Sequence, residues 1–239
     1  MNRPTALITQ ESYHVYNRGA HKNAIFLDAE DHERFLLLLY LSNSREPVNL
    51  RDLKEKHKGL TFVLLRELKT VGQDLVDVFA YSLLPNHFHI VMRQKVDGGV
   101  ARFMQKLCTG YSMYFNLRHG HSGTLFQGRF KSSHVDTDPY HKWLFAYVHL
   151  NPVSIFEPNW SKEKGIENVG RAQEFINSYR YSSYWDYYVG ERPERTILAY
   201  AETADMLDKK EDLIGLISES KKGAPLYEDF ESGEKGKEA

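Results

Sequence analysis

The strongest structural signal in this chain of 239 residues is the sequence Pro85-Asn86-His87-Phe88-His89-Ile90-Val91-Met92. Residues 76–84 and 87–92 both have the aromatic, apolar and β-branched character of strands. The Pro85-Asn86 pair between them favours a turn, so the two runs are expected to form a hairpin. Side chains two residues apart on a strand point to the same face. His87 and His89 are therefore expected side by side, with Phe88 on the opposite face.

Further strands and helices are predicted on both sides of this hairpin. Residues 12–18 alternate aromatic or apolar side chains with polar ones, as strands do, and residues 131–136 are a second strand candidate. The order of elements predicts an α+β fold of the split βαβ type, an antiparallel sheet with helices over one face. Helices are predicted after the N-cap candidate Asp28, over residues 100–117, and from the N-cap candidate Asp138 to Asn151.

The chain is expected to divide into a core and a C-terminal extension. The core is assigned to residues 1–155, with an insertion at about 43–75. Residues 156–218 are expected to form a helical or irregular extension, and residues 219–239 a disordered tail.

The composition is that of a globular protein, with 41% hydrophobic and 26% charged residues and a net charge of −1. No apolar run has the length of a membrane span, and the N-terminus lacks a secretion signal, so a cytoplasmic location without membrane association is expected. The single cysteine, Cys108, excludes an intramolecular disulfide.

Basic residues are concentrated in the middle of the chain. Between Arg102 and Lys142 there are six Lys or Arg and only two acidic residues. This pattern is compatible with a surface that binds a polyanion, and equally with a solvated helix face.

A second pair of candidate site residues lies on the helix predicted from Asp138. Tyr147 and Asn151 are four residues apart and share one face of that helix. If the helix packs beside the hairpin, the Asn151 carbonyl oxygen can join His87 and His89 as a metal ligand. Such a mixed set suits Mg²⁺ or Mn²⁺, with substrate phosphate oxygens completing the coordination. Tyr147 is then placed to attack a phosphorus atom polarised by the metal.

Each of these candidates also has a structural interpretation. His87 and His89 can be ordinary strand residues, Tyr147 a core aromatic, and Asn151 a helix-terminal residue before proline. Tyr111, on another predicted helix near basic residues, competes with Tyr147 as a nucleophile.

Five segments of the sequence, in the same order, resemble the REP-associated tyrosine transposases within the single-tyrosine HUH transposases. Four of them fall within about residues 8–155, and the fifth follows the core. They are residues 13–19 (YHVYNRG), 84–89 (LPNHFH), 122–131 (SGTLFQGRFK), 147–153 (YVHLNPV) and 181–184 (YSSY).

The resemblance implies a ferredoxin-like core of four to five strands that cleaves single-stranded DNA beside a hairpin of a repetitive palindromic element. Tyr147 would form a 5′-phosphotyrosine link and release a 3′-OH, and a second 3′-OH would rejoin that link. His87 and His89 would be the metal pair, with Asn151 as third ligand. Monomer and homodimer remain open, as does whether the protein still moves DNA. Expected contacts to the DNA are Arg18, Arg102, Lys106, Arg129 and Lys131 for phosphates, and Tyr16 and Phe126 for bases.

Two alternatives keep the fold but change the activity. One is a non-catalytic module that binds single-stranded nucleic acid. The other is a metal-dependent phosphodiesterase that uses water, with Tyr147 in a structural role.

Overall fold

The structure, a computed structural model, describes residues 7–47, 74–158 and 165–203 together with residues 55, 62, 160 and 213. The predicted tail at 219–239 lies outside the described residues, as does most of the predicted insertion at 43–75.

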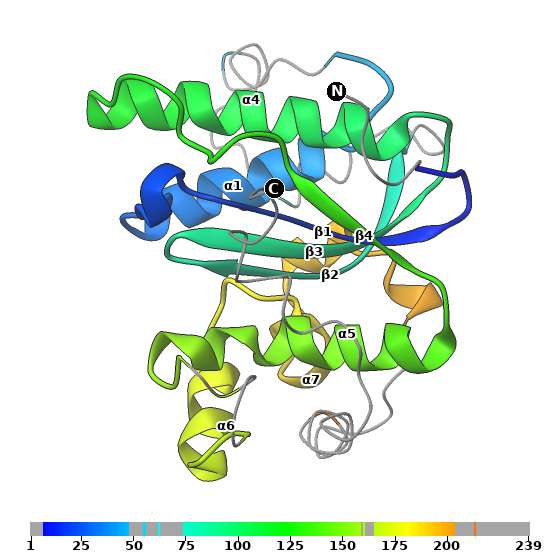
Figure 1. Cartoon of the computed structure of the whole chain (residues 1–239), viewed down its shortest axis with the longest axis vertical. Coiled ribbons are helices and arrows are strands. Elements are labelled where there is room, and N and C mark those ends of the chain that lie inside the picture. Colours follow the sequence, from blue (N-terminus) through cyan, green and yellow to red (C-terminus); the bar gives the residue numbers. More distant parts are fainter. Residues whose placement is uncertain are drawn as a thin grey trace, which may run out of the picture.

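One antiparallel sheet organises the described part of the chain, and its strand order is β2-β3-β1-β4 (Figure 1). This order, with one helix after β1 and one after β3, is the split βαβ arrangement, so the α+β prediction is confirmed. The turn at Pro85-Asn86 joins β2 to β3 as expected. The strands are β1 (Ser12–Arg18), β2 (Val76–Leu84), β3 (His87–Gln94) and β4 (Lys131–Val135).

Helices cover both faces of the sheet, which corrects the prediction that they pack on one face (Figure 1). The helices α1 (Ala29–Leu41) and α4 (Gly99–His119) lie on one side, and α5 (Asp138–Leu150) lies on the other. Each residue of β2 is buried, as expected for a strand covered on both sides. The remaining elements are α6 (Val169–Ser178), α7 (Tyr184–Tyr188) and the short 3₁₀ turns η1 (Ala20–Lys22), η2 (Asn151–Ile155), η3 (Pro193–Ile197) and η4 (Tyr200–Glu202).

The caps of the helices explain where they begin and end. Asp28 caps α1 as predicted, accepting a hydrogen bond from the Asp31 backbone N–H at 3.1 Å. For α5 the cap is Thr137, not Asp138, because the Thr137 hydroxyl accepts from the Tyr140 N–H. The α5 helix ends at Leu150, within the limit predicted from Pro152, although Asn151 keeps helical backbone angles and begins η2.

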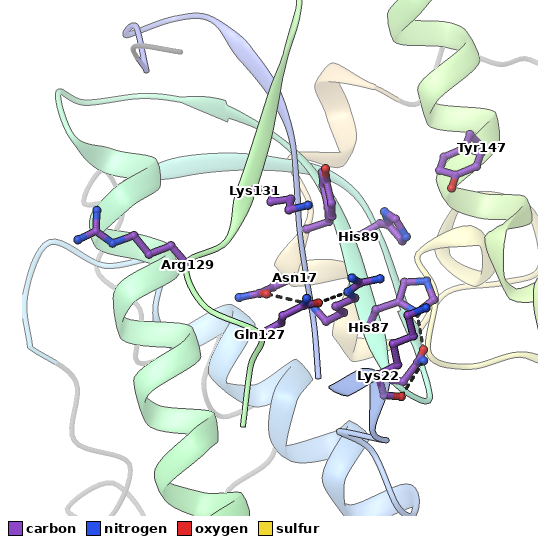
Figure 2. A pocket seen from close by; sticks show the side chains of 11 residues that line it. Asn17, Lys22, His87, His89, Gln127, Arg129, Lys131 and Tyr147 are labelled. Carbon is purple, nitrogen blue, oxygen red and sulfur yellow. Dashed lines mark hydrogen bonds between the residues drawn. The ribbon is translucent and has the colours of Figure 1, made fainter. Parts of the chain in front are cut away.

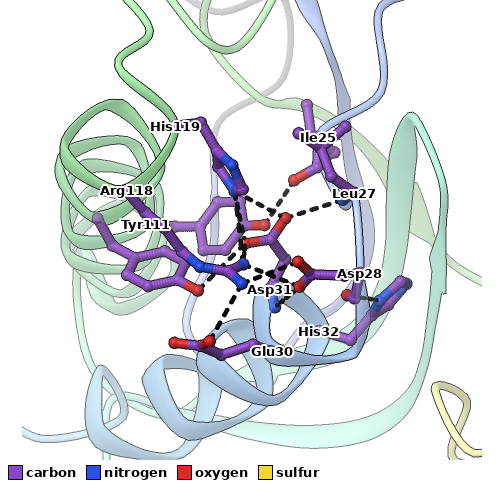
Figure 3. Close-up of polar contacts among 10 residues, drawn as sticks. Ile25, Leu27, Asp28, Glu30, Asp31, His32, Tyr111, Arg118 and His119 are labelled. Atoms are coloured by element: carbon purple, nitrogen blue, oxygen red, sulfur yellow. Dashed lines mark hydrogen bonds and ion pairs between the residues drawn. The ribbon is translucent and has the colours of Figure 1, made fainter.

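A buried carboxylate ties α1 to the C-terminal end of α4 (Figure 3). The side chain of Asp31 is fully buried and accepts hydrogen bonds from Arg118 Nη1 at 2.6 Å, His119 Nε2 at 3.0 Å and the Tyr114 hydroxyl at 3.1 Å. The Leu27 backbone N–H donates to its other oxygen at 2.8 Å. These contacts hold the pKa of Asp31 below its usual range despite burial, so the group stays ionised.

The C-terminal extension covers the outer edge of β2. Leu83 N–H donates to the Tyr181 carbonyl at 2.9 Å, and Ser183 N–H donates to the Tyr81 carbonyl at 3.0 Å. Behind this contact, Arg192 forms a buried ion pair with Asp186 at 2.7 Å and donates to the Tyr81 hydroxyl at 3.0 Å. Backbone groups that would otherwise face solvent at this edge are therefore satisfied.

Among the described helices, none combines the length and apolar character needed to cross a bilayer.

Candidate functional site

The strand register gathers the candidate residues on the face of the sheet that α5 covers. Tyr16 of β1 is paired with His89 of β3 on one side and with Lys131 of β4 on the other. Arg18 is paired with His87. Residues opposite each other in an antiparallel pair share a face, so these side chains project together.

A pocket of about 350 Å³ lies over these strand ends, and Tyr147 of α5 completes its wall (Figure 2). None of its lining residues is acidic, while four are cationic, so the pocket attracts anions. The lining residues are Tyr16, Asn17, Arg18, Lys22, Asn86, His87, His89, Gln127, Arg129, Lys131 and Tyr147.

Two hydrogen bonds fix which nitrogen of His87 carries its proton. The Asn86 side-chain N–H₂ donates to the Lys22 carbonyl at 3.2 Å, which leaves the Asn86 amide oxygen to face His87. That oxygen accepts from His87 Nδ1 at 2.6 Å. Because an amide oxygen can only accept, Nδ1 holds a proton, and in the neutral ring Nε2 then keeps its lone pair.

His89 is bonded through Nδ1 to a second histidine. His89 Nδ1 lies 2.9 Å from Nε2 of His14, a fully buried residue of β1. Burial lowers the pKa of His14 to about 3. Burial, followed by the charges of His87 and His14, places the pKa of His89 well below its usual value. Both rings are therefore neutral at pH 7, the form in which imidazole binds metals.

His14 was not predicted as a site residue, although it lies within the quoted segment 13–19. The signal was available, because His14 and Tyr16 are two residues apart on a strand and share a face. Asn17, Lys22, Asn86 and Gln127 of the lining were also missed. Strand alternation assigns Asn17 to the face opposite Tyr16, and no spacing rule places a turn side chain in a pocket.

The ring of Tyr147 is held by aromatic neighbours on three elements. It is stacked on Trp143 at 5.2 Å and on Trp160 at 6.1 Å, measured between ring centres. Its edge-to-face contacts are with His89 at 5.8 Å and His14 at 6.4 Å. Figure 2 shows Tyr147 projecting from α5 toward the strand that carries His89. The tyrosine and the histidine pair thus meet in one pocket.

The competing tyrosine, Tyr111, lies on the other side of the sheet. It is fully buried in the core with Phe35 and Phe88, and its hydroxyl donates to the Ile25 carbonyl at 2.5 Å. Burial raises its pKa. Tyr111 therefore has no access to the pocket that holds the histidines.

The structure places three residues predicted to contact DNA outside the pocket. Phe126 is buried and packs against Phe88, with ring centres 5.9 Å apart, so it is not an exposed platform for a base. Arg102 and Lys106 lie on α4, away from the pocket. Their side chains donate to the backbone carbonyls of Arg45 at 3.3 Å and of Ser44 at 2.5 Å.

Asn151 does not line the pocket. It begins η2, directly after α5, and is buried. Within the described residues its amide oxygen has no hydrogen-bond partner. Burying a hydrogen-bond acceptor without a partner costs about 1–3 kcal/mol of folding free energy. A cation or a donor bound to the Asn151 oxygen would remove this cost.

The donors in this region fit a divalent metal bound by nitrogen and oxygen. Across the described ranges no three His, Cys, Asp or Glu side chains converge as a metal cluster. A metal would therefore rest on Nε2 of His87 and of His89, whose ring centres are 5.0 Å apart, and on neutral or substrate oxygens.

Comparisons with known proteins give a fold likeness at low sequence identity. No protein-family model matches the chain, and no curated protein matches it. The chain is similar to a solved structure of a REP-associated tyrosine transposase bound to a REP hairpin, with a TM-score of 0.45 and 12% identity. That match covers 78% of this chain and 84% of the other.

Proposed function

We propose that this protein is a metal-dependent nuclease and strand transferase of single-stranded DNA with Tyr147 as its nucleophile. One observation carries the proposal: four of the five family-like sequence segments converge on one cationic pocket. Apart from Lys22, each lining residue comes from residues 13–19, 84–89, 122–131 or 147–153. The fifth segment, 181–184, pairs with the edge of β2.

The metal part of the proposal assigns His87 and His89 as ligands through Nε2. Asn151 lies outside the pocket lining, but its buried amide oxygen lacks a hydrogen-bond partner among the described residues and would be the third donor. Mg²⁺ or Mn²⁺ bound there would supply Lewis-acid polarisation of a phosphoryl oxygen. The hydrogen bond from His87 to Asn86 supports this assignment, because it leaves the pocket-facing nitrogen unprotonated.

The chain's own residues supply binding and the nucleophile. Arg18, Arg129 and Lys131 would bind the phosphates of a single strand, and Tyr16 offers a ring at the pocket wall for a base. The Tyr147 oxygen would attack phosphorus, and the bond to the 3′ oxygen would break. The tyrosine gives up its proton and the departing 3′ oxygen gains one, leaving a 5′-phosphotyrosine link. A second 3′-OH reverses these steps and restores Tyr147.

A labelled DNA hairpin with a single-stranded flank, incubated with the protein and Mn²⁺ or Mg²⁺, tests this function. Denaturing electrophoresis should reveal a covalent protein–DNA adduct that depends on the metal. Tyr147→Phe should abolish the adduct, whereas Tyr140→Phe on the same helix and Tyr111→Phe across the sheet should retain it.

The same gel separates the alternatives. Nicked DNA that is free of protein would indicate a water-dependent phosphodiesterase. Binding on a native gel without cleavage, with and without metal, would indicate a non-catalytic nucleic-acid-binding module. An adduct that persists in Tyr147→Phe would assign the nucleophile to another residue.

A further inference from the structure

We propose that His14 is a positioning residue that holds the proton of His89 on Nδ1 and so turns the lone pair of His89 Nε2 toward the pocket. The inference rests on the metal site of the proposed function and deepens it, because it names the residue that prepares one of the two imidazoles.

The geometry begins with the register of β1. His14 is paired with Val91 of β3, two residues beyond His89, and with Ser133 of β4. It therefore shares the pocket-facing side of the sheet with Tyr16 and His89, but it is fully buried and does not line the pocket. The His14 and His89 rings stack with centres 5.0 Å apart, and their nearest nitrogens are 2.9 Å apart.

The two metal-candidate imidazoles are prepared in different ways. His87 faces an amide oxygen, which can only accept, so the hydrogen bond to Asn86 fixes its proton on Nδ1. His89 faces another imidazole, whose nitrogen can accept or donate. Its proton position therefore depends on His14.

Only one of the two arrangements leaves His89 able to bind a metal. If His14 Nε2 accepts, His89 carries its proton on Nδ1 and presents a lone pair at Nε2. If His14 Nε2 donates, His89 Nδ1 must accept, and the proton of the neutral ring occupies Nε2. A metal at the pocket selects the first arrangement, and a residue that favours that arrangement beforehand raises metal affinity.

The surroundings of His14 restrict how its ring can lie. It is stacked on Tyr16 at 5.1 Å and meets the edge of Tyr147 at 6.4 Å. The ring is completely buried, where a polar imidazole is unfavourable unless it is hydrogen-bonded. A buried polar side chain aimed at a candidate ligand is the pattern of an outer-shell partner of a metal site.

The test measures Mn²⁺ binding to the full chain by calorimetry, without DNA. His14→Phe keeps an aromatic ring but removes both nitrogens, and Mn²⁺ affinity should fall about 10–100-fold. His14→Gln keeps an acceptor at the end of the side chain and should restore most of the affinity. His134→Gln is the matched control, because His134 lies on the neighbouring strand in register with Tyr13, and so on the opposite face.

A second measurement does not need metal. Nitrogen-15 spectra of the wild-type protein should show His89 protonated at Nδ1 and not at Nε2. In His14→Phe the proton should move partly or wholly to Nε2. Thermal unfolding of each variant establishes that the compared chains are folded.

The outcomes separate this inference from the proposed function. Unchanged Mn²⁺ affinity in folded His14→Phe would overturn the role of His14 and leave the metal site intact. If His14→Phe does not fold, two other results would overturn the role of His14. One is a nitrogen-15 spectrum of the wild-type protein with His89 protonated at Nε2. The other is a folded His14→Gln variant that does not bind Mn²⁺. A wild-type chain that binds no Mn²⁺ would overturn the metal part of the proposed function and this inference with it.

Discussion

The ring of Tyr147 meets the ring of His89 edge to face, with their centres 5.8 Å apart, although one belongs to α5 and the other to β3. This contact links the two halves of the proposed chemistry, a hydroxyl nucleophile and a metal-binding imidazole. Its geometry depends on Trp143, which stacks on Tyr147 one turn earlier in the same helix.

Trp143→Ala is therefore expected to slow adduct formation. Removing the indole leaves a cavity beside Tyr147, lowers the free energy of unfolding by about 3–5 kcal/mol and frees the tyrosine ring. Trp143→Phe keeps a stacking ring and should retain most of the rate. Single-turnover adduct formation, compared with urea unfolding, separates the two effects. Equal rates for both variants would contradict the positioning role of Trp143.

Stability should fall as the pH drops from about 6.5 toward 3. Burial lowers the pKa of His14 and of His149 to about 3, while the unfolded chain takes up protons near 6.5. In that window the unfolded state binds more protons, so stability decreases by up to about 1.4 kcal/mol per pH unit for each histidine. Above 6.5 these two groups contribute no pH dependence.

Urea unfolding at pH 7 and pH 5 checks this expectation. His149 lies outside the pocket and bonds the Ser183 hydroxyl at 2.8 Å, so His149→Gln isolates one histidine. The loss of stability between pH 7 and 5 should be smaller in this variant than in the wild type. Identical losses would show that His149 is already protonated in the folded chain at pH 5.

Pocket cations should govern binding to single-stranded DNA. Lys131→Ala should weaken binding and reduce the slope of log affinity against log salt by about 0.7, the contribution of one phosphate contact. Lys106→Ala is the matched control, because Lys106 lies on α4 and donates to backbone carbonyls. Fluorescence anisotropy over a range of salt concentrations measures both. A larger effect at Lys106 would place the DNA on the opposite side of the sheet.

Asp31→Asn should destabilise the fold without changing the chemistry. The substitution removes the charge that Arg118 and His119 contact, and about 2–3 kcal/mol of unfolding free energy should be lost. Glu30→Gln is the control, since Glu30 is exposed and contacts Arg118 at the surface, where an ion pair contributes little. Adduct formation by the folded fraction should be the same in both variants, and a selective loss in Asp31→Asn would link this cluster to the pocket.

The hairpin and the shared face of His87 and His89 were predictable because strand side chains alternate with a fixed period. The side of the sheet on which α5 packs was not, because an amphipathic pattern identifies a buried face but not its partner. This is why helices were expected on one face alone. The sequence could bring Tyr147 near the histidines only on the condition that its helix packs beside the hairpin, and in the structure Tyr147 does line the same pocket as His87 and His89.

The positions of the basic residues could not be predicted from the sequence either. Arg102, Lys106 and Lys131 belong to the same basic stretch of the sequence, yet α4 and β4 place them on different sides of the protein. Lys22 reaches the pocket from a turn in which His21 and Lys22 have positive φ angles of 55° and 63°. Neither is a glycine, so the sequence carries no signal for that conformation. Clustering along the chain is therefore a poor guide to clustering in space.

The pairing of residues 181–183 with β2 also limits how two copies of the protein can associate. Two sheets join most readily when an outer strand of one adds to an outer strand of the other. Here one flank of the sheet already has its backbone hydrogen bonds satisfied by the same chain. Within the described ranges, the other edge strand is β4, so a sheet that continues from one subunit to another would have to pair through β4. With five residues, β4 offers only a short edge for such pairing.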